Sequence, residues 1–253
     1  MKVSVCVPTF ERPSTTRLLI ESFLAQDHGV RELIVSDDSA SEDIEHLVAA
    51  YSDDRIRYLR HGRTVGFHEN LCRALAHCSG EVIVIMGDDD VCARVDALSL
   101  YAEAFSANRS VGLASANLVQ IDAGGKVTFA YVRVDETVVF EKGTESFEHL
   151  LLSSVHIAGI AFPHLPELLD LYPADPMWFP QVYLVAGVLT NYSGMVIGQL
   201  ITAARMHEQQ LGFAWVKEAG RSTFKNRIDI SGVKGGSSSS SPNQGRHASV
   251  EIS

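Results

Sequence analysis

Short apolar runs alternate with amphipathic stretches along the first 110 residues of this chain. The apolar runs predict strands over residues 3–7, 32–36, 56–59 and 82–86. The stretches between them carry apolar residues at helical spacing, and they predict helices over residues 14–27, after Ser41 as the N-cap, after Gly66, and over residues 93–105. This alternation is typical of a largely parallel sheet covered by helices.

The pattern changes from Val111 onward to strands separated by turns. Further strands are predicted over residues 111–121, 126–134 and 137–140. We expect residues 1–110 and 111–231 to form two halves of one α/β domain. Residues 232–253 are rich in Gly and Ser, and they predict a flexible tail because they cannot bury enough apolar surface.

The stretch from Pro176 through Ala204 contains no charged residue and is long enough to suggest a membrane span. A turn signal, Asn191-Tyr192-Ser193-Gly194, lies near its middle. We therefore expect two buried elements of about ten residues each rather than one span. Peripheral contact with a membrane stays open.

Composition limits the classes of partner. The chain has 253 residues and 46% hydrophobic content, enough for a sizeable core. Its 21 basic and 31 acidic residues give a net charge of −10, which argues against nucleic-acid binding and supplies no polybasic membrane patch. The four cysteines lack metal-site spacing and predict reduced thiols. No signal peptide is expected, because the chain enters a strand directly. We expect a cytoplasmic protein, with the inner membrane face as the alternative location.

The most informative feature is an apolar run, Val82–Met86, that ends in the acidic residues Asp88, Asp89 and Asp90. Open α/β sheets bind ligands just past the carboxyl ends of such strands. Adjacent carboxylates repel one another unless a cation intervenes, and Mg²⁺ and Mn²⁺ prefer oxygen ligands, often shared with phosphates. The triplet therefore predicts a metal-held phosphate. The alternative is a solvated turn in which Asp90 caps the next helix.

Two other predicted strands also end in polar residues. The first ends at Pro8 and Thr9, and the second at Asp37 and Asp38. Parallel strands joined by right-handed crossovers bring these ends to one edge of the sheet, where the acids can accept hydrogen bonds from a base or from ribose. No dinucleotide-binding or P-loop motif accompanies them. The combination predicts a site for a nucleoside diphosphate.

These pieces resemble the family 2 glycosyltransferases of the GT-A fold over residues 2 to about 108, and they occur in the family's order. They are Val3–Arg12, Glu32–Asp43, the spaced residues Gly66, Asn70, Ala74, Gly80 and Glu81, and the acidic triplet. The resemblance implies a Rossmann-like, mostly parallel central sheet flanked by helices, with an acceptor-side region in the C-terminal half. Glu11 stands where relatives often carry Asn, and Gly87 where many carry an acid.

The resemblance also implies roles for individual residues. The nucleotide would be bound by Pro8, Thr9, Glu11, Asp37, Asp38, Asn70 and Asp88. Within this set, Asp38 with Asp37 would contact the base, and Asp88 the ribose. Mg²⁺ or Mn²⁺ would be bound by Asp89 or Asp90, because the family's Asp-x-Asp can be laid over Asp88 and Asp90 or over Gly87 and Asp89. We favour Asp89.

The C-terminal half offers weaker candidates. Inverting enzymes of the family place an acidic base on a helix there, and Asp175 is the nearest carboxylate, although Asp before Pro176 is also typical of a turn. His207 is a candidate further metal ligand, with a surface loop as the alternative, and Arg205 could pair with phosphate.

Other residues on the expected acceptor side have ordinary structural explanations. Trp178 and Phe179 could stack on a sugar, although aromatic residues in an apolar run more often belong to the core. His156 and His164 are more typical of core or surface positions than of catalysts.

The leading hypothesis is a metal-dependent, inverting transfer of a sugar from a nucleoside diphosphate, UDP above all, to a carbohydrate or lipid-linked acceptor. One alternative is nucleotidyl transfer, although residues 8–15 lack the Gly and Lys of its first loop. The other is a binding module that has lost catalysis, because Pro180-Gln181 stands near where an acid is expected.

Overall fold

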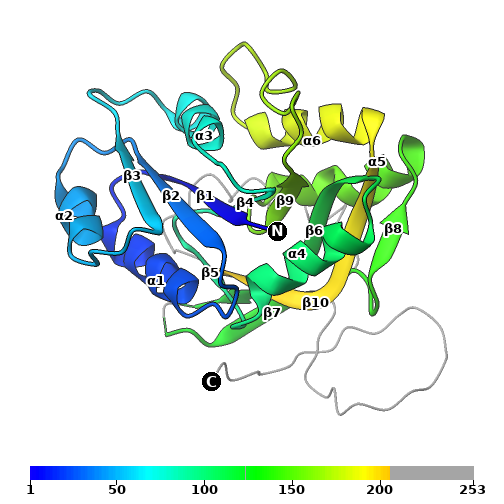
Figure 1. Cartoon of the computed structure of the whole chain (residues 1–253), viewed down its shortest axis with the longest axis horizontal. Helices are drawn as coiled ribbons and strands as arrows, with labels where there is room; N and C mark the ends of the chain where they lie inside the picture. The colour runs from blue at the N-terminus through cyan, green and yellow to red at the C-terminus, as the bar shows by residue number, and fades with distance from the viewer. Residues whose placement is uncertain (123, 206–253) are drawn as a thin grey trace.

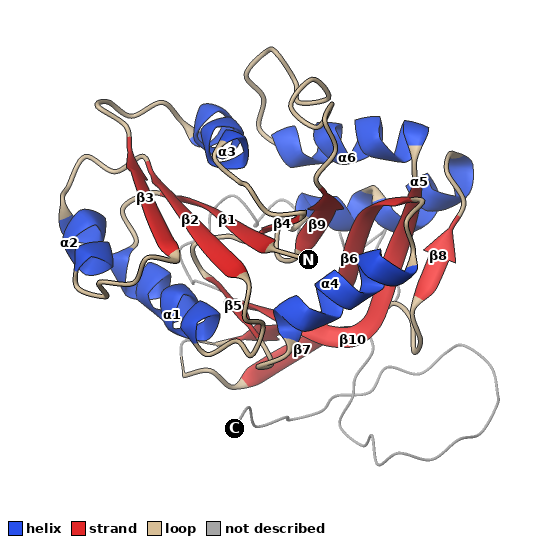
Figure 2. Ribbon diagram, viewed as in Figure 1, coloured by secondary structure: helices blue, strands red, loops and turns tan. Residues whose placement is uncertain are grey.

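The computed structural model describes residues 1–122 and 124–205, which form a ten-stranded sheet with helices on both faces (Figures 1 and 2). The strands are β1 (Val3–Thr9), β2 (Arg31–Asp37), β3 (Ile56–Arg60), β4 (Val82–Ile85), β5 (Asp90–Cys92), β6 (Val111–Ile121), β7 (Val127–Tyr131), β8 (Val138–Phe140), β9 (Ile160–Pro163) and β10 (Ser193–Arg205). The helices are α1 (Pro13–Leu24), α2 (Asp43–Ala49), α3 (Phe67–Ala76), α4 (Ala97–Ala107), α5 (Thr144–Leu150) and α6 (Pro180–Asn191), with a 3₁₀ helix η1 (Leu152–Val155). The expected α/β class is confirmed.

The sheet has the order β3-β2-β1-β4-β9-β6-β10-β5, with β7 beside β6 and β8 beside β10. β1 pairs in parallel with β2 and β4, β2 with β3, and β6 with β10. β9 lies antiparallel between β4 and β6, so the strands on either side of it run in one direction. One sheet therefore passes through both expected halves of the chain.

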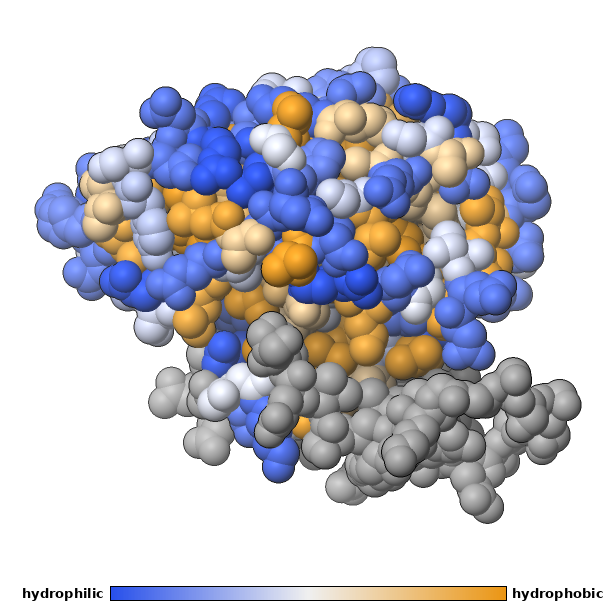
Figure 3. Space-filling view, turned by 60° about the horizontal axis from the view of Figure 1, so that its bottom comes forward, coloured by the Kyte–Doolittle hydropathy of each residue, from blue (hydrophilic) through white to orange (hydrophobic). Residues whose placement is uncertain are grey.

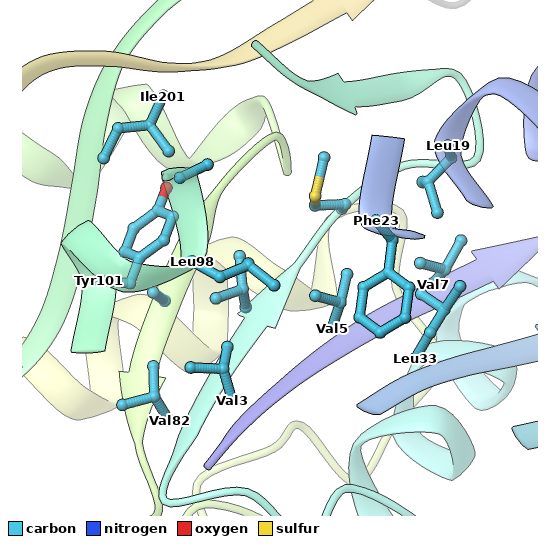
Figure 4. Close-up of a cluster of buried hydrophobic side chains, with 14 of the residues drawn as sticks. Val3, Val5, Val7, Leu19, Phe23, Leu33, Val82, Leu98, Tyr101 and Ile201 are labelled. Atoms are coloured by element: carbon cyan, nitrogen blue, oxygen red, sulfur yellow. The ribbon is translucent and has the colours of Figure 1, made fainter. Parts of the chain in front are cut away.

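Alternation along the central strands gives the sheet an apolar layer on each face. Val3, Val5 and Val7 of β1 pack in one cluster with α1, α2 and α4, and Figure 4 shows Val5 and Val7 near Phe23 of α1. Cys6, on the opposite face of the same strand, packs in a second cluster with α3 and α6. Both faces of β1 are fully buried, which explains its continuous apolar run.

Two helix starts differ from expectation. Glu42 rather than Ser41 is the N-cap of α2, because the Ser41 hydroxyl donates to Glu11 Oε2 at 3.1 Å instead. α4 begins at Ala97 rather than near residue 93, because the residues from Asp90 to Cys92 pair with β10 as β5. The sequence offered little sign of a strand as short as β5.

The uncharged stretch forms two elements, as expected: the helix α6, buried along one side, and the strand β10. Within the described part of the chain, no helix combines the length and apolar character needed to cross a bilayer. Hydrophilic and hydrophobic residues are interspersed on the face of the molecule in Figure 3. The predicted tail lies outside the described residues.

Candidate functional site

A cavity of about 670 Å³ opens at the sheet edge where β1, β2 and β4 end. We call the part of its lining that comes from residues 8–90 the first wall, and the part from residues 120–205 the second wall. The first wall includes Pro8, Thr9, Arg12, Asp38, Asn70, Asp88, Asp89 and Asp90. The second wall is formed by Gln120, Val155, His156, Ile157, Ala158, Trp178, Phe179, Gln181, Ala204 and Arg205.

Asp38 fixes the loop that leads into α3. Its carboxylate accepts hydrogen bonds from the backbone N–H groups of Val65, at 2.6 Å, and Gly66, at 2.8 Å. Gly66 is the N-cap of α3 and has φ +86°, a conformation that favours glycine. Asp38 is 3% exposed and lines the cavity, so its remaining acceptor capacity faces a preformed pocket.

Asp37 has a different surrounding from its neighbour. Its carboxylate is fully buried and accepts hydrogen bonds from the Tyr58 hydroxyl, at 2.7 Å, and the Ser39 N–H, at 2.9 Å. It does not line the cavity. The structure therefore places Asp38 in the site. Asp37 is buried at the end of β2, where it holds Tyr58 and the backbone of Ser39.

Asp88 connects the end of β4 to the loop after β1. It accepts hydrogen bonds from Thr9 Oγ1 at 3.0 Å, Phe10 N at 3.3 Å and Arg12 Nη1 at 3.0 Å. Burial raises the pKa of Asp88, and the Arg12 guanidinium opposes this by lowering it. Arg12 thus partly neutralises the acidic triplet, and it also lies 3.4 Å from Asp89 Oδ2.

Asp90 begins β5 and does not cap a helix, so the solvated-turn alternative is wrong. Its Oδ2 accepts a hydrogen bond from the Gly87 N–H at 2.7 Å, and the residue is 4% exposed. Burial, followed by repulsion from Asp89, raises the pKa of Asp90 well above its ordinary value. A cation bound in the cavity would therefore stabilise the ionised form of Asp90.

The acidic residues fit a cation shared with a ligand better than a cation held by protein alone. In the part of the chain that the structure describes, no group of three or more His, Cys, Asp and Glu side chains is arranged to hold a metal ion. Asp89 and Asp90 both line the cavity. A protein usually supplies one or two carboxylates to Mg²⁺, and phosphate oxygens of the substrate and water complete the coordination. His207 lies outside the described residues.

Asn70 and Glu11 occupy different places relative to the cavity. Asn70 lines it, and its Nδ2 donates to the Thr9 carbonyl at 3.2 Å. Glu11 is exposed, does not line the cavity, and has φ +53°. Its carboxylate accepts hydrogen bonds from the N–H groups of Ala40, at 2.8 Å, and Ser41, at 3.3 Å, which lower its pKa. Glu11 therefore shapes the loop after β2 from outside the cavity.

The second wall begins beside the acidic triplet. The Gly159 N–H donates to the Ile85 carbonyl of β4 at 3.0 Å, which brings the segment Val155–Ala158 next to the end of that strand. Gln181, in the first turn of α6, donates from Nε2 to the Val155 carbonyl at 3.2 Å. The residue is 2% exposed, and its Oε1 has no hydrogen-bond partner.

Asp175 does not belong to either wall. It is exposed in the loop between β9 and α6 and is not among the residues that line the cavity. Its role as a base stays a prediction that the geometry does not favour.

Sequence reasoning gave no role in the site to Arg12 or Gln120, and it treated His156 as structural. Arg12 lies in the loop that follows β1, three residues after Thr9, and this closeness to a predicted site strand is the sequence signal for it. The positions of His156 and Gln120 depend on the insertion of β9 between β4 and β6, for which no local sequence pattern exists.

Comparison with known proteins identifies sequence relatives. The family model described as Glycosyl transferase family 2 matches residues 4–157. The chain is 39% identical over 92 residues to the Campylobacter jejuni GalNAc(5)-diNAcBac-PP-undecaprenol beta-1,3-glucosyltransferase, a match that covers 35% of this chain and 30% of that protein. It is 32% identical over 89 residues to the Escherichia coli UDP-Glc:alpha-D-GlcNAc-diphosphoundecaprenol beta-1,3-glucosyltransferase WfgD, covering 35% of each. The matches span about a third of these relatives.

Solved structures share the fold. Residues 1–349 of S. aureus TarS in complex with UDP-GlcNAc superpose with a TM-score of 0.66 at 17% identity, covering 83% of this chain and 60% of that one. The mannosyltransferase PcManGT from Pyrobaculum calidifontis, in complex with GDP-Man and Mn²⁺, gives a TM-score of 0.57 at 20% identity, covering 85% of this chain and 59% of that one. The expected GT-A type fold is confirmed.

Proposed function

We propose a function for this chain on the premise that it belongs to glycosyl transferase family 2, whose model matches more than half of it. The chain transfers a sugar, with inversion, from a UDP-sugar to a carbohydrate or lipid-linked acceptor. The names of the two sequence relatives, which both contain an undecaprenol-linked diphosphate, support such an acceptor. One observation carries the proposal: the ends of β1, β2 and β4 bring Thr9, Asp38 and Asp88 to the first wall of one cavity.

The first wall suits a nucleoside diphosphate. Asp38 uses its carboxylate to hold the loop before α3 and retains lone pairs for a base or ribose N–H or O–H group. Pro8 and Asn70 shape the same wall, and Asp88 lies at the end of β4, where ribose would follow the base. Arg12 supplies a permanent positive charge beside the position of the diphosphate.

Asp89 and Asp90 are the residues that would hold Mg²⁺ or Mn²⁺. The cation would neutralise negative charge that develops on the diphosphate as the sugar leaves. Mn²⁺ in the complex of the mannosyltransferase PcManGT supports a divalent cation in this fold.

The direct test measures UDP binding by calorimetry with and without Mn²⁺, followed by UDP release from UDP-Glc and UDP-GlcNAc in the presence of GlcNAc-diphosphoundecaprenol. We expect Mn²⁺-dependent UDP binding that Asp89→Ala abolishes and that Asp54→Ala, an exposed control on the loop before β3, leaves intact. A wild-type chain that binds neither UDP nor GDP would overturn the proposal.

The reaction products separate the alternatives. Release of pyrophosphate from a nucleoside triphosphate would indicate nucleotidyl transfer, whereas UDP binding without release across an acceptor panel would indicate a binding module. Flotation of the chain with vesicles that contain the lipid-linked acceptor tests peripheral membrane contact.

A further inference from the structure

The strand order arranges the cavity along one sheet edge. Asp38 lies at the end of β2, Thr9 at the end of β1 and Asp88 just after β4, and these strands are neighbours in the sheet. β9 follows β4 in the sheet, and the segment that leads into it carries His156. A ligand that extends from the base past the diphosphate therefore reaches His156 next, where the sugar and its acceptor belong.

His156 is the group on this part of the cavity whose side chain can take up a proton. The charged or titratable side chains that line the cavity within the described residues are Arg12, Asp38, Asp88, Asp89, Asp90, His156 and Arg205. All of these acids belong to the first wall. A guanidinium group does not act as a proton acceptor.

The two other candidates for the role lack a suitable group or position. Gln181 lies on the second wall, but an amide does not accept a proton at neutral pH. Asp175 is exposed outside the lining.

The backbone on both sides of His156 is fixed. The preceding residue, Val155, accepts the hydrogen bond from Gln181, and Gly159 is bonded to β4. The imidazole ring lies 5.8 Å from the ring of Tyr131, at an interplanar angle of 47°. A proton acceptor must be held within reach of the hydroxyl that it serves, and this segment is held from two sides.

The surroundings of His156 favour its neutral form. Burial lowers the pKa of His156, so the neutral imidazole predominates at neutral pH. The charged side chains of the neighbouring elements are Arg133, which donates to Ser153 of η1, Arg205 on the second wall, and the acids of the first wall. Tyr131 packs against the ring from β7.

We infer that His156 is the base that accepts the proton of the acceptor hydroxyl, an inference that rests on the proposed function. As the hydroxyl oxygen forms a bond to the anomeric carbon, the bond from that carbon to the β-phosphate oxygen breaks and its electron pair leaves with UDP. The proton moves to His156, which releases it to water. Gln181 is a positioning residue in this scheme, because it holds Val155.

The test compares His156→Gln with Asp175→Asn and with His164→Gln, a matched control at an exposed histidine after β9. We expect His156→Gln to lower kcat by about 100-fold or more while the Kd for UDP changes little. The acidic limb of the kcat/KM profile against pH, which we attribute to protonation of His156, should disappear in this variant alone. The two other variants should keep kcat within about threefold of the wild type.

A second variant keeps the inference testable if glutamine disturbs the fold. His156→Ala leaves space for free imidazole, which should restore a measurable part of kcat with a dependence on the neutral imidazole concentration. Retention of kcat in His156→Gln, loss of kcat in Asp175→Asn, or absence of rescue by imidazole each overturns the inference while the wild type still releases UDP. A wild type that releases no UDP in any donor and acceptor pair overturns the proposed function, and the inference with it.

Discussion

The two walls of the cavity are built in different ways. On the first wall, Asp38 and Asp88 are 3% and 6% exposed, and each accepts several hydrogen bonds from elements far away in the chain. On the second wall, Trp178 is 90% exposed, and the buried Oε1 of Gln181 lacks a hydrogen-bond partner. The acids of the first wall are held in place by hydrogen bonds within the protein before a ligand binds. On the second wall, the Trp178 ring and Gln181 Oε1 remain for contacts with a ligand. This difference suits a constant nucleotide on one side and a more variable acceptor on the other.

The strongest test of the comparison is Asp38→Ala. This change leaves the N–H groups of Val65 and Gly66 without their shared acceptor. Because hydrogen bonds to a charged group contribute about 1.5–3 kcal/mol each, we expect the free energy of unfolding to fall by about 3 kcal/mol and UDP binding to weaken by about 30-fold or more. Urea denaturation and calorimetry measure the two effects. Wild-type affinity for UDP in this variant would contradict a preformed first wall.

A buried acid far from the cavity should affect stability alone. Glu32 accepts hydrogen bonds from Lys2 Nζ, at 2.7 Å, and from Ser79 N, at 2.7 Å, and also bonds the Ser4 hydroxyl. Burial acts to raise its pKa, but these bonds lower it from 4.5 to about 2. We expect Glu32→Gln to reduce the free energy of unfolding by about 2 kcal/mol at pH 7 without changing the Kd for UDP.

The pH dependence of Glu32 has a defined sign. Because the folded-state pKa is depressed, its stabilisation is fully present above pH 4.5 and is lost as the pH falls toward about 2. Melting temperatures of the wild type and of Glu32→Gln should therefore converge over this range. If the difference in melting temperature between the wild type and Glu32→Gln stayed constant down to about pH 2, the hydrogen bonds assigned to Glu32 would be ruled out.

Gln181→Met tests whether the second wall depends on positioning. The variant loses the hydrogen bond to Val155, so we expect a reduction of about 1 kcal/mol in the free energy of unfolding. If the displaced segment carries the base, kcat should fall by about tenfold while the Kd for UDP is unchanged. Gln199→Met, at an exposed position on β10, is the matched control and should alter neither.

The smallest effect on stability is expected from Trp178→Ala. An indole that is 90% exposed adds little to the folded state, so the free energy of unfolding should change by less than about 0.5 kcal/mol. Loss of a stacking surface for a sugar should raise the KM for the acceptor by about threefold to tenfold. Tyr183→Ala, another exposed aromatic residue outside the cavity, serves as the control. An unchanged acceptor KM would show that Trp178 makes no contact with substrate.

The first wall could be predicted from the sequence because its geometry follows from parallel strands. Each buried apolar run ends in polar residues, and the crossover rule brings those ends to one edge. The distinction between Asp37 and Asp38 was not available, because it depends on the Tyr58 hydroxyl from the next strand. Adjacent carboxylates in one motif thus have different surroundings.

The second wall could not be predicted, because its position depends on pairing between distant segments. β9 has four residues, too few for periodicity to indicate its direction or its neighbours. The expected base, Asp175, is the carboxylate nearest in the sequence to Pro180-Gln181, where the family resemblance places an acid, whereas the residues on the cavity are fixed by β9 and by the Gln181 bond.

The position of β9 also determines which segments of the chain can change in length without disrupting the sheet. β9 is hydrogen-bonded to β4 and adjoins β6, so cutting the chain between its halves would expose two unpaired strand edges at the centre of the molecule. The loop that follows β9, from residue 164 to residue 179, lies outside the sheet pairing and contributes Trp178 and Phe179 to the cavity. Tyr172, in the middle of this loop, donates to the His68 carbonyl of α3 at 2.7 Å, so changes there would disturb the nucleotide side. Insertions or deletions between Tyr172 and Trp178 would instead reshape the proposed acceptor entrance. A single loop is thus a natural place to engineer a new acceptor preference.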